Sequence, residues 1–369
     1  MTGNHVLTKL LGTSCLGIGL VIVLFLSSEK QIHRNNAFTR RFPPHPLLKI
    51  HEFDLGSNSY YFAGFHQNNL YLGNSTAPLW LLKINLATKD TTLLKIDLEE
   101  RDLPFRQIKT KLFPPYFFLM DGTVPCIFKG RINEWKARPW SMKSAYFDEA
   151  FPMYQDCIFI RTIQAGSGTT TLGKIRKDTI RPVTLAPDIL EKQVDGVFDV
   201  DGIFTYSPEH DFASYVYYYR NEFIILDSNL RVLERRRTLD TIQKAQIQVA
   251  ETRQEGISEM QAPPMIVNEN AALEGNLIYI SSNRIGKYED GKILAQATII
   301  DIYDWEEGRY RSSFYFYKDK DEYIREFKVK GNTLYTLVGN RLTVHSFRNH
   351  ILKDLGSYTM EPKEKSIGR

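Results

Sequence analysis

Residues 275–283 read GNLIYISSN, and this stretch decides the fold because similar stretches recur along the chain. NNLYLGN at 68–74 and GNTLYTLVGN at 331–340 share its apolar run and its final asparagine. Short apolar runs bounded by Gly and Asn are typical of β-strands separated by turns. One unit repeated along a chain indicates a repeat architecture.

A second repeated pattern is a hairpin that follows such a strand, with an apolar run, a short turn and another apolar run. It occurs as WLLKINLATKDTTLLKI (80–96), EFIILDSNLRVLERR (222–236), TIIDIYDWEEGRYRSSF (298–314) and RLTVHSFRNHILKDL (341–355). An inner strand, a strand ending in Asn or Gly, and an outer hairpin make a four-stranded blade. The sequence therefore predicts an all-β fold, a six-bladed β-propeller, with blades near 60–96, 108–140, 144–185, 196–238, 264–316 and 322–358.

Two further segments complete the predicted domain at 46–369. We expect PLLKIHEF (46–53) to add a strand to the last blade and close the ring, which leaves no free sheet edge. TIQKAQIQVAETRQEGISEMQ (241–261) lacks the strand pattern. It predicts an insert between blades four and five, formed by a short helix or a long loop.

The N-terminus predicts a membrane anchor. LLGTSCLGIGLVIVLFLSS (10–28) carries no charge and is long enough to cross a hydrocarbon core of about 30 Å as a helix. Leu26, Ser27 and Ser28 fit a signal-peptidase site poorly, so residues 1–28 are expected to remain as a signal anchor and single transmembrane helix. Lipidation of Cys15 is not expected, because Gly12 holds the position of the usual leucine and the apolar stretch follows the cysteine.

Residues 29–45 are polar, end in Pro43-Pro44, and predict a linker between anchor and domain. A short leader before an anchor commonly feeds the following domain across the membrane, so we expect an inner-membrane protein with a periplasmic C-terminal domain. The basic residues after the anchor favour the opposite orientation, because they outnumber Lys9 on the other side. They are Lys30, Arg34, Arg40 and Arg41.

Composition excludes several classes of function. The net charge is only +4 over 369 residues, with basic and acidic side chains interleaved, so no nucleic-acid partner is expected. The 8 histidines lack metal-ligand spacing, and no metal or other cofactor is expected. Cys126 and Cys157 precede Ile-Phe in successive predicted strands, either as two separate buried thiols or as a bridged pair.

GSGTTTLGKI (166–175) resembles a phosphate-binding loop, with Gly168, Gly173 and Lys174 at the matching positions. Ile175 replaces the hydroxyl residue that would hold magnesium, and Pro182 and Pro187 stand where a helix is required. The stretch is better explained as a turn at 166–168 that leads into an outer hairpin of blade three. No nucleotide is expected.

The sequence offers only weak candidates for a site, and no catalytic residue, because no G-x-S-x-G elbow is present. His210 stands between Glu209 and Asp211, and the asparagines Asn74, Asn283 and Asn340 lie at strand ends, where turn chemistry also explains them. In YVYYYRN (215–221), strand alternation would place Tyr215, Tyr217 and Tyr219 on one face and Tyr218 and Arg220 on the other, either around a ligand or at a packed blade interface. The candidate ligand-binding residues are Tyr219, Arg220, His210, Asn268, Asn283 and Asn340.

SYVYYYRNEFIILDSNLRVLERRRTLDT, APPMIVNENAAL and GNTLYTLVGNRLTVHSF together resemble an uncharacterised Bacteroidetes family similar to TolB-like six-bladed propellers. The resemblance covers about residues 46–358 and implies an envelope protein, without catalytic residues to transfer. The expected function is a non-catalytic binding or scaffold module whose partner is an envelope protein or a small molecule. The alternatives are a purely structural component and a hydrolase or redox enzyme with calcium or a quinone in the channel.

Overall fold

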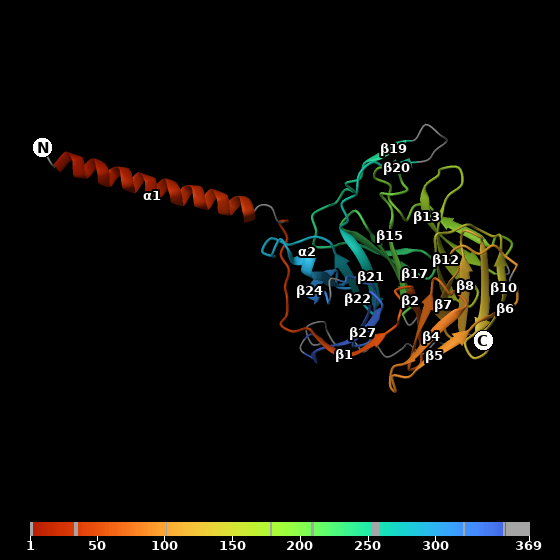
Figure 1. The fold of residues 1–369 in the computed structure, drawn as a ribbon. Helices are drawn as coiled ribbons and strands as arrows, with labels where there is room; N and C mark the ends of the chain where they lie inside the picture. Colours follow the sequence, from red (N-terminus) through yellow and green to blue (C-terminus); the bar gives the residue numbers. More distant parts are fainter. Residues whose placement is uncertain are drawn as a thin grey trace.

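The computed structural model describes residues 3–32, 36–100, 102–177, 179–207, 210–251, 258–319, 322–349 and 351. A helix, α1 (Gly3–Ile32), precedes a body built almost entirely of β-strands (Figure 1). Over the described residues, no helix combines the length and the apolar character needed to cross a membrane.

The strands of the described chain form six sheets of four or five strands, which confirms the predicted six-bladed propeller. Blade one contains β2 (Tyr60–His66), β3 (Asn69–Asn74), β4 (Trp80–Asn85) and β5 (Thr91–Lys95). Blade two contains β7 (Lys109–Phe113), β8 (Tyr116–Asp121), β9 (Cys126–Arg131) and β10 (Lys136–Met142), with β6 (Asp97–Leu98) parallel to β10 at its outer edge. Blade three contains β11 (Glu149–Tyr154), β12 (Cys157–Ile163), β13 (Thr170–Arg176) and β14 (Val183–Ala186).

The second half of the ring repeats this order. Blade four contains β15 (Gly202–Ser207), β16 (Phe212–Tyr217), β17 (Glu222–Asp227) and β18 (Val232–Arg237). Blade five contains β21 (Asn268–Glu274), β22 (Leu277–Ser282), β23 (Ala297–Asp304) and β24 (Arg309–Tyr317). Blade six contains β25 (Ile324–Lys330), β26 (Thr333–Val338), β27 (Arg341–Phe347) and β1 (Leu47–Asp54).

The last blade is assembled from both ends of the propeller sequence. β1 pairs antiparallel with β27, with Leu48 opposite Ser346 and Glu52 opposite Thr343. The predicted closing strand at 46–53 is therefore confirmed. Because the outer strand comes from the start of the domain and its three neighbours from the end, hydrogen bonds between them hold the ring closed.

The core consists of apolar layers between neighbouring blades. Blades three and four, for example, bury Phe159, Tyr215 and Tyr217 against each other, and blades six and one bury Leu72 and Leu342. Similar buried clusters fill the other four interfaces between adjacent blades. Burying one such side chain contributes about 1.5–3 kcal/mol, so the repeated apolar runs stabilise the ring as well as each sheet.

The segment 166–175, which resembles a phosphate-binding loop in sequence, lies in blade three, as expected. Gly173 and Lys174 are in β13 between β12 and β14, with Gly173 opposite both Ile160 and Leu185. Gly166 and Gly168 form the preceding turn with φ of 93° and 67°, values that favour glycine. A strand, β14, follows where a phosphate loop needs a helix.

Cys126 and Cys157 are both free and buried, which confirms two separate thiols. Burial raises the pKa of Cys126 to about 11, and the neighbouring Asp121 carboxylate adds to this shift. Burial likewise raises the pKa of the Cys157 thiol. Both thiols are therefore held in the protonated, unreactive form at neutral pH.

The insert between blades four and five was expected at about 241–261 as a short helix or a long loop, and where it is described it is a loop that carries a short two-stranded ribbon. β19 (Val249–Glu251) pairs antiparallel with β20 (Ser258–Met260), and residues 252–257 lie outside the described chain.

Residues 36–42 of the expected linker pack against blade five. Arg40 is buried there, with Nε 2.6 Å from Asp301 Oδ1 and Nη1 2.9 Å from Glu289 Oε1. Phe42 stacks on Tyr315 at 4.2 Å between ring centroids, close to the short helix α2 (Ile293–Gln296). This part of the chain is thus a fixed strap on the propeller, whereas Arg34 lies outside the described residues.

Candidate functional site: a charged chamber in the central channel

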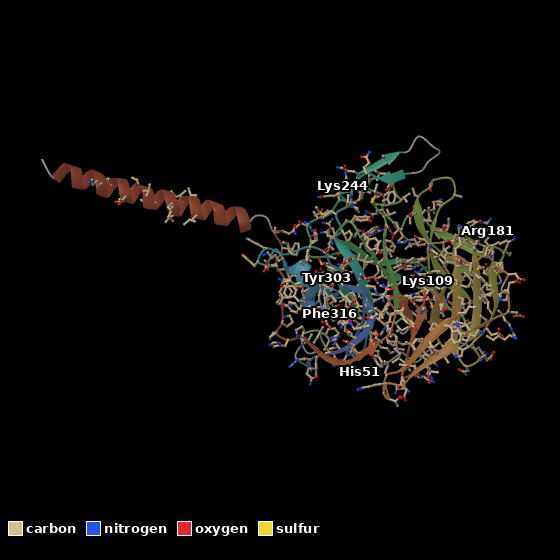
Figure 2. All side chains as sticks on the ribbon, viewed as in Figure 1. His51, Lys109, Arg181, Lys244, Tyr303 and Phe316 are labelled. Atoms are coloured by element: carbon tan, nitrogen blue, oxygen red, sulfur yellow. The ribbon has the colours of Figure 1, made fainter. Side chains whose placement is uncertain are left out.

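The first strand of each blade, β2, β7, β11, β15, β21 and β25, lies at one edge of its sheet. Neighbouring first strands contact each other around a ring, so they are the inner strands that surround the central channel. Side chains alternate along a strand, and those that do not enter an interface between blades face the channel. Figure 2 labels one of these residues, Lys109 of β7.

A chamber of about 460 Å³ lies where the inner strands begin. Every blade contributes to its wall through an inner strand. The six contributions include Tyr61, Lys109, Glu149, Ile203, Asn270 and Glu326. A volume in this range accommodates a small organic molecule, since ligand sites typically measure about 300–1,000 Å³.

A second, smaller chamber of about 140 Å³ lies where the inner strands end. Its wall includes Phe65, Pro152 and Leu273, and it is therefore the more apolar of the two. Lys111, Phe151 and Lys328 line both chambers. These shared residues form a layer between the two chambers, which we call the lysine layer.

Lys111 holds its charge inside the channel with little compensation. Its Nζ donates one long hydrogen bond, of 3.3 Å, to the carbonyl oxygen of Phe62, and lies 5.3 Å from the centroid of the Phe151 ring. Burial lowers the pKa of Lys111, with the carboxylates of Glu326 and Glu149 acting in the opposite direction. No ion pair within 4.0 Å joins Lys111 to another described residue, and a half-buried charge in that state favours a ligand of opposite sign.

Glu149 is an acidic residue of the same chamber, and one of its carboxylate oxygens lacks a hydrogen-bond donor within the described chain. Its Oε2 is buried and has no hydrogen-bond partner among the residues that the structure describes. Burial raises the pKa of Glu149, while the positive charges of Arg161 and Lys111 oppose that shift. An unsatisfied buried acceptor costs about 1–3 kcal/mol, so a donor brought by a ligand would relieve it.

Glu326 and Lys328 of β25 are already engaged with their surroundings. Lys328 Nζ lies 3.8 Å from Glu326 Oε1, and the backbone N–H of Phe62 donates to Glu326 Oε2 at 3.2 Å. This contact ties blade six to blade one at the channel wall. The pair can shape the local potential without needing a ligand to satisfy it.

Aromatic side chains cover the rest of the chamber wall. Tyr61 Oη accepts a hydrogen bond of 2.8 Å from the backbone N–H of Thr110, which fixes the ring, and burial raises the pKa of Tyr61 to about 12. Tyr218 lines the chamber from the loop between β16 and β17, and burial raises its pKa to about 12. Both phenols are therefore neutral at physiological pH and able to donate hydrogen bonds.

Two of the candidates from the sequence, Arg220 and Asn268, lie together beside the chamber. The Asn268 Nδ2 donates to the carbonyl oxygens of Tyr217 and Arg220, at 2.8 and 3.0 Å. Arg220 is fully buried, with its guanidinium 3.5 Å from the centroid of the Tyr217 ring and Nη1 donating to the Glu191 carbonyl oxygen. These residues hold the loop that carries Tyr218.

The expected division of the tyrosine run between two faces is wrong at its end. Strand β16 stops at Tyr217, and the chain then bends, so alternation does not continue through Tyr218, Tyr219 and Arg220. Arg220 consequently lies over Tyr217 instead of on the opposite face. Tyr215 and Tyr217 belong to the packed interface between blades three and four, and Tyr219 is buried.

The structure places the other three candidates apart from the chamber. His210 lies in the turn between β15 and β16, where its Nδ1 is 3.0 Å from Ser207 Oγ, and its neighbour Glu209 is outside the described residues. Asn283 is exposed in the loop after β22. Asn340 donates to Asp54 Oδ1 at 3.2 Å and so links the turn after β26 to β1.

Sequence reasoning missed Lys111, Glu149 and Lys328, although a signal was present. In KTKLF (109–113) and REFKVK (325–330), charged residues alternate with apolar ones in strands that open their blades. In the first strand of a propeller blade, a charged alternate position points to the channel. Over the described residues, no group of three or more His, Cys, Asp and Glu side chains is arranged to hold a metal ion.

Comparisons with known proteins support the fold alone. No family model and no curated protein matches the sequence. The crystal structure of a member of the DUF4221 family from Bacteroides vulgatus is similar with a TM-score of 0.52 and 12% identity, over 83% of this chain and 99% of that one. A catalytically inactive virginiamycin B lyase from Staphylococcus aureus is similar with a TM-score of 0.46 and 8% identity, over 82% of this chain and 100% of that one.

Proposed function

We propose that the protein is a membrane-anchored binding module of the cell envelope that takes a small polar molecule into the larger channel chamber. The observation that carries the proposal is that all six inner strands contribute residues to one chamber, which contains a buried carboxylate oxygen, Glu149 Oε2, without a hydrogen-bond partner in the described part of the chain. Preformed chambers with a few convergent polar groups are typical of ligand sites.

The proposed mechanism is non-catalytic. Lys111 and Glu149 supply opposite charges, Tyr61 and Tyr218 supply neutral aromatic walls, and the ring of blades holds them in place. The lysine layer disfavours calcium at mid-channel, because a divalent cation there would face two ammonium groups. The loops of the propeller faces remain available to an envelope protein as a second partner.

The location in the proposal rests on sequence. The uncharged segment 10–28 supports a signal anchor in the inner membrane, and the resemblance to TolB-like propellers of Bacteroidetes supports a periplasmic domain. Alkaline phosphatase fused to the C-terminus, an enzyme active only after export, should be active. Fluorescence from a C-terminal green fluorescent protein without phosphatase activity would refute the periplasmic location.

Binding is tested with the full chain in detergent by saturation-transfer NMR against a panel of small polar metabolites. Asn270→Trp places a large ring in the chamber, because the Asn270 side chain lines it, whereas Thr92→Trp adds the same ring on the exposed outer strand β5. We expect Asn270→Trp to abolish binding and Thr92→Trp to leave it unchanged. Equal binding by both variants would show that the chamber is not the site.

A further inference from the structure

We propose that the chamber binds a small zwitterion with an apolar side group, such as an amino acid or a very short peptide. The ligand carboxylate would contact Lys111, and its ammonium group would contact Glu149. The inference rests on the proposed function, because it names the ligand class of the same chamber.

The first step of the inference is that two opposite charges in the channel are each left for a ligand. Within the described chain, Lys111 has one long hydrogen bond to a carbonyl oxygen and lies over the Phe151 ring, and Glu149 Oε2 has no hydrogen-bond partner. The strands β7 and β11 that carry them belong to adjacent blades. Charges shielded from water are stabilised by pairing or hydrogen bonding, so the two half-buried groups together favour a ligand that offers an acceptor to Lys111 and a donor to Glu149.

The second step excludes ligands of a single charge sign. The chamber wall contains three lysines, Lys109, Lys111 and Lys328, and three acidic residues, Asp148, Glu149 and Glu326. A simple anion would satisfy Lys111 but would leave Glu149 without a donor and add repulsion from the carboxylates. A simple cation would bind Glu149 but would leave Lys111 without an acceptor and would be repelled by the lysines. A molecule that carries both charges therefore fits best a wall with equal numbers of lysines and acidic residues.

The third step concerns the uncharged part of the ligand. Phe147, Phe151, Ile203 and Tyr218 line the same chamber as the charges. Phe151 also faces the smaller chamber, which Phe65 and Leu273 make apolar. An aromatic or large aliphatic side group would bury its surface on these residues, which favours a hydrophobic amino acid over glycine.

The experiment uses three related probes, L-phenylalanine, phenethylamine and 3-phenylpropionate, with the full chain in detergent and isothermal titration calorimetry. Phenethylamine lacks the carboxylate, and 3-phenylpropionate lacks the ammonium group. We expect L-phenylalanine to bind at least about tenfold more tightly than either, because one charged hydrogen bond is lost in each analogue.

Variants then assign each charge to its residue. Lys111→Met should weaken L-phenylalanine about tenfold and leave phenethylamine unchanged, while Glu149→Gln should weaken L-phenylalanine and leave 3-phenylpropionate unchanged. Lys111→Arg should restore part of the affinity. Lys136→Met, on the exposed face of β10, is the matched control, and near-ultraviolet circular dichroism verifies that each variant is folded.

The outcomes separate this inference from the proposed function. If the two analogues bind as tightly as L-phenylalanine, the zwitterion assignment is overturned and the chamber remains a site. The same conclusion follows if none of the three probes binds but a metabolite does, and Asn270→Trp blocks the binding of that metabolite. If Asn270→Trp affects no ligand, the proposed function fails, and the assignment fails with it. Charge-specific losses in both variants support the assignment.

Discussion

Arg40 Nε lies 2.6 Å from Asp301 Oδ1, across 261 positions of sequence, with both side chains buried. The same guanidinium binds Glu289 and the Ser282 hydroxyl. Together with the stack of Phe42 on Tyr315, this arginine ahead of the first strand therefore fixes the strap at 36–42 to blade five. Because β1 follows immediately and pairs with β27 in blade six, the start of the domain is bound to two blades.

Removing this arginine should destabilise the propeller. Arg40→Met would leave the Asp301 and Glu289 carboxylates buried without their cation, a change that typically costs about 3–5 kcal/mol. Arg106→Met is the matched control, because Arg106 is an exposed loop residue, and its effect should stay within about 0.5 kcal/mol. Urea unfolding followed by tryptophan fluorescence measures both. Equal midpoints for the two variants would show that the Arg40 ion pairs do not stabilise the propeller.

The close packing of the Tyr61 ring against the backbone of Gly73 gives a second prediction. The two residues are opposite each other in β2 and β3, and a Cβ at position 73 would overlap the Tyr61 ring. Gly73→Ala should therefore destabilise the protein by about 1–3 kcal/mol and distort the chamber wall.

A double-mutant cycle measures this relationship directly. Tyr61→Leu removes the ring that the added methyl group would strike, so Gly73→Ala should cost much less in that background. Additive losses in the free energy of unfolding would contradict the proposed overlap. The combined variant also shows how far ligand binding depends on the Tyr61 ring.

His345 predicts a pH dependence of stability. It lies in β27 opposite Lys49 of β1, and burial lowers its pKa to about 4, with the Lys49 charge acting in the same direction. The folded state thus favours the neutral imidazole, and stability is full above the ordinary histidine pKa of about 6.5 and falls as the pH decreases from there towards 4. The loss over this range should be about 1–2 kcal/mol, since one unit of pKa difference corresponds to about 1.4 kcal/mol.

His345→Gln tests this assignment, because glutamine does not titrate. Urea midpoints from pH 7 to pH 4.5 should fall less for the variant than for the natural protein. Parallel curves for the two proteins would mean that other groups control the decrease. The same experiment reports on ring closure, since His345 is placed at the β1–β27 junction.

The fold was largely predictable because the information is local and repeated. GNLIYISSN and GNTLYTLVGN became β22 and β26 with their flanking turns, and the hairpins at 80–96, 222–236 and 298–314 became the outer strands of their blades. The hairpin predicted at 341–355 is wrong where it is described, because no strand follows β27 there and β1 is the outer strand of blade six. The strap was not predictable from its composition, because its buried contacts involve residues more than 240 positions away. The ribbon at β19 and β20 was missed because its strands are only three residues long.

The chamber was harder to predict, since its wall is divided among all six blades, which are far apart in the sequence. Asn268 and Arg220 were predicted to bind a ligand, but they hold the loop of Tyr218 and do not line the chamber themselves. Lys111 and Glu149 look ordinary in their own segments. Their importance arises only when the ring brings adjacent inner strands together, where Lys111 has one long hydrogen bond and Glu149 Oε2 has no partner among the described residues.

The last prediction is the pH dependence of ligand binding, which requires Glu149 ionised and Lys111 protonated. Burial raises the pKa of Glu149 above its ordinary value of 4.5 and lowers that of Lys111 below 10.5. The affinity for L-phenylalanine should therefore fall on the acid side at a pH above 4.5, where Glu149 takes up a proton, and on the alkaline side below 10.5, where Lys111 loses one. Calorimetric titrations across this range measure both limbs. Glu149→Gln should remove the loss of affinity at acid pH, and Lys111→Met should remove the part of the alkaline loss that comes from the lysine. If Glu149→Gln still loses affinity at the same acid pH, another group is responsible for that titration.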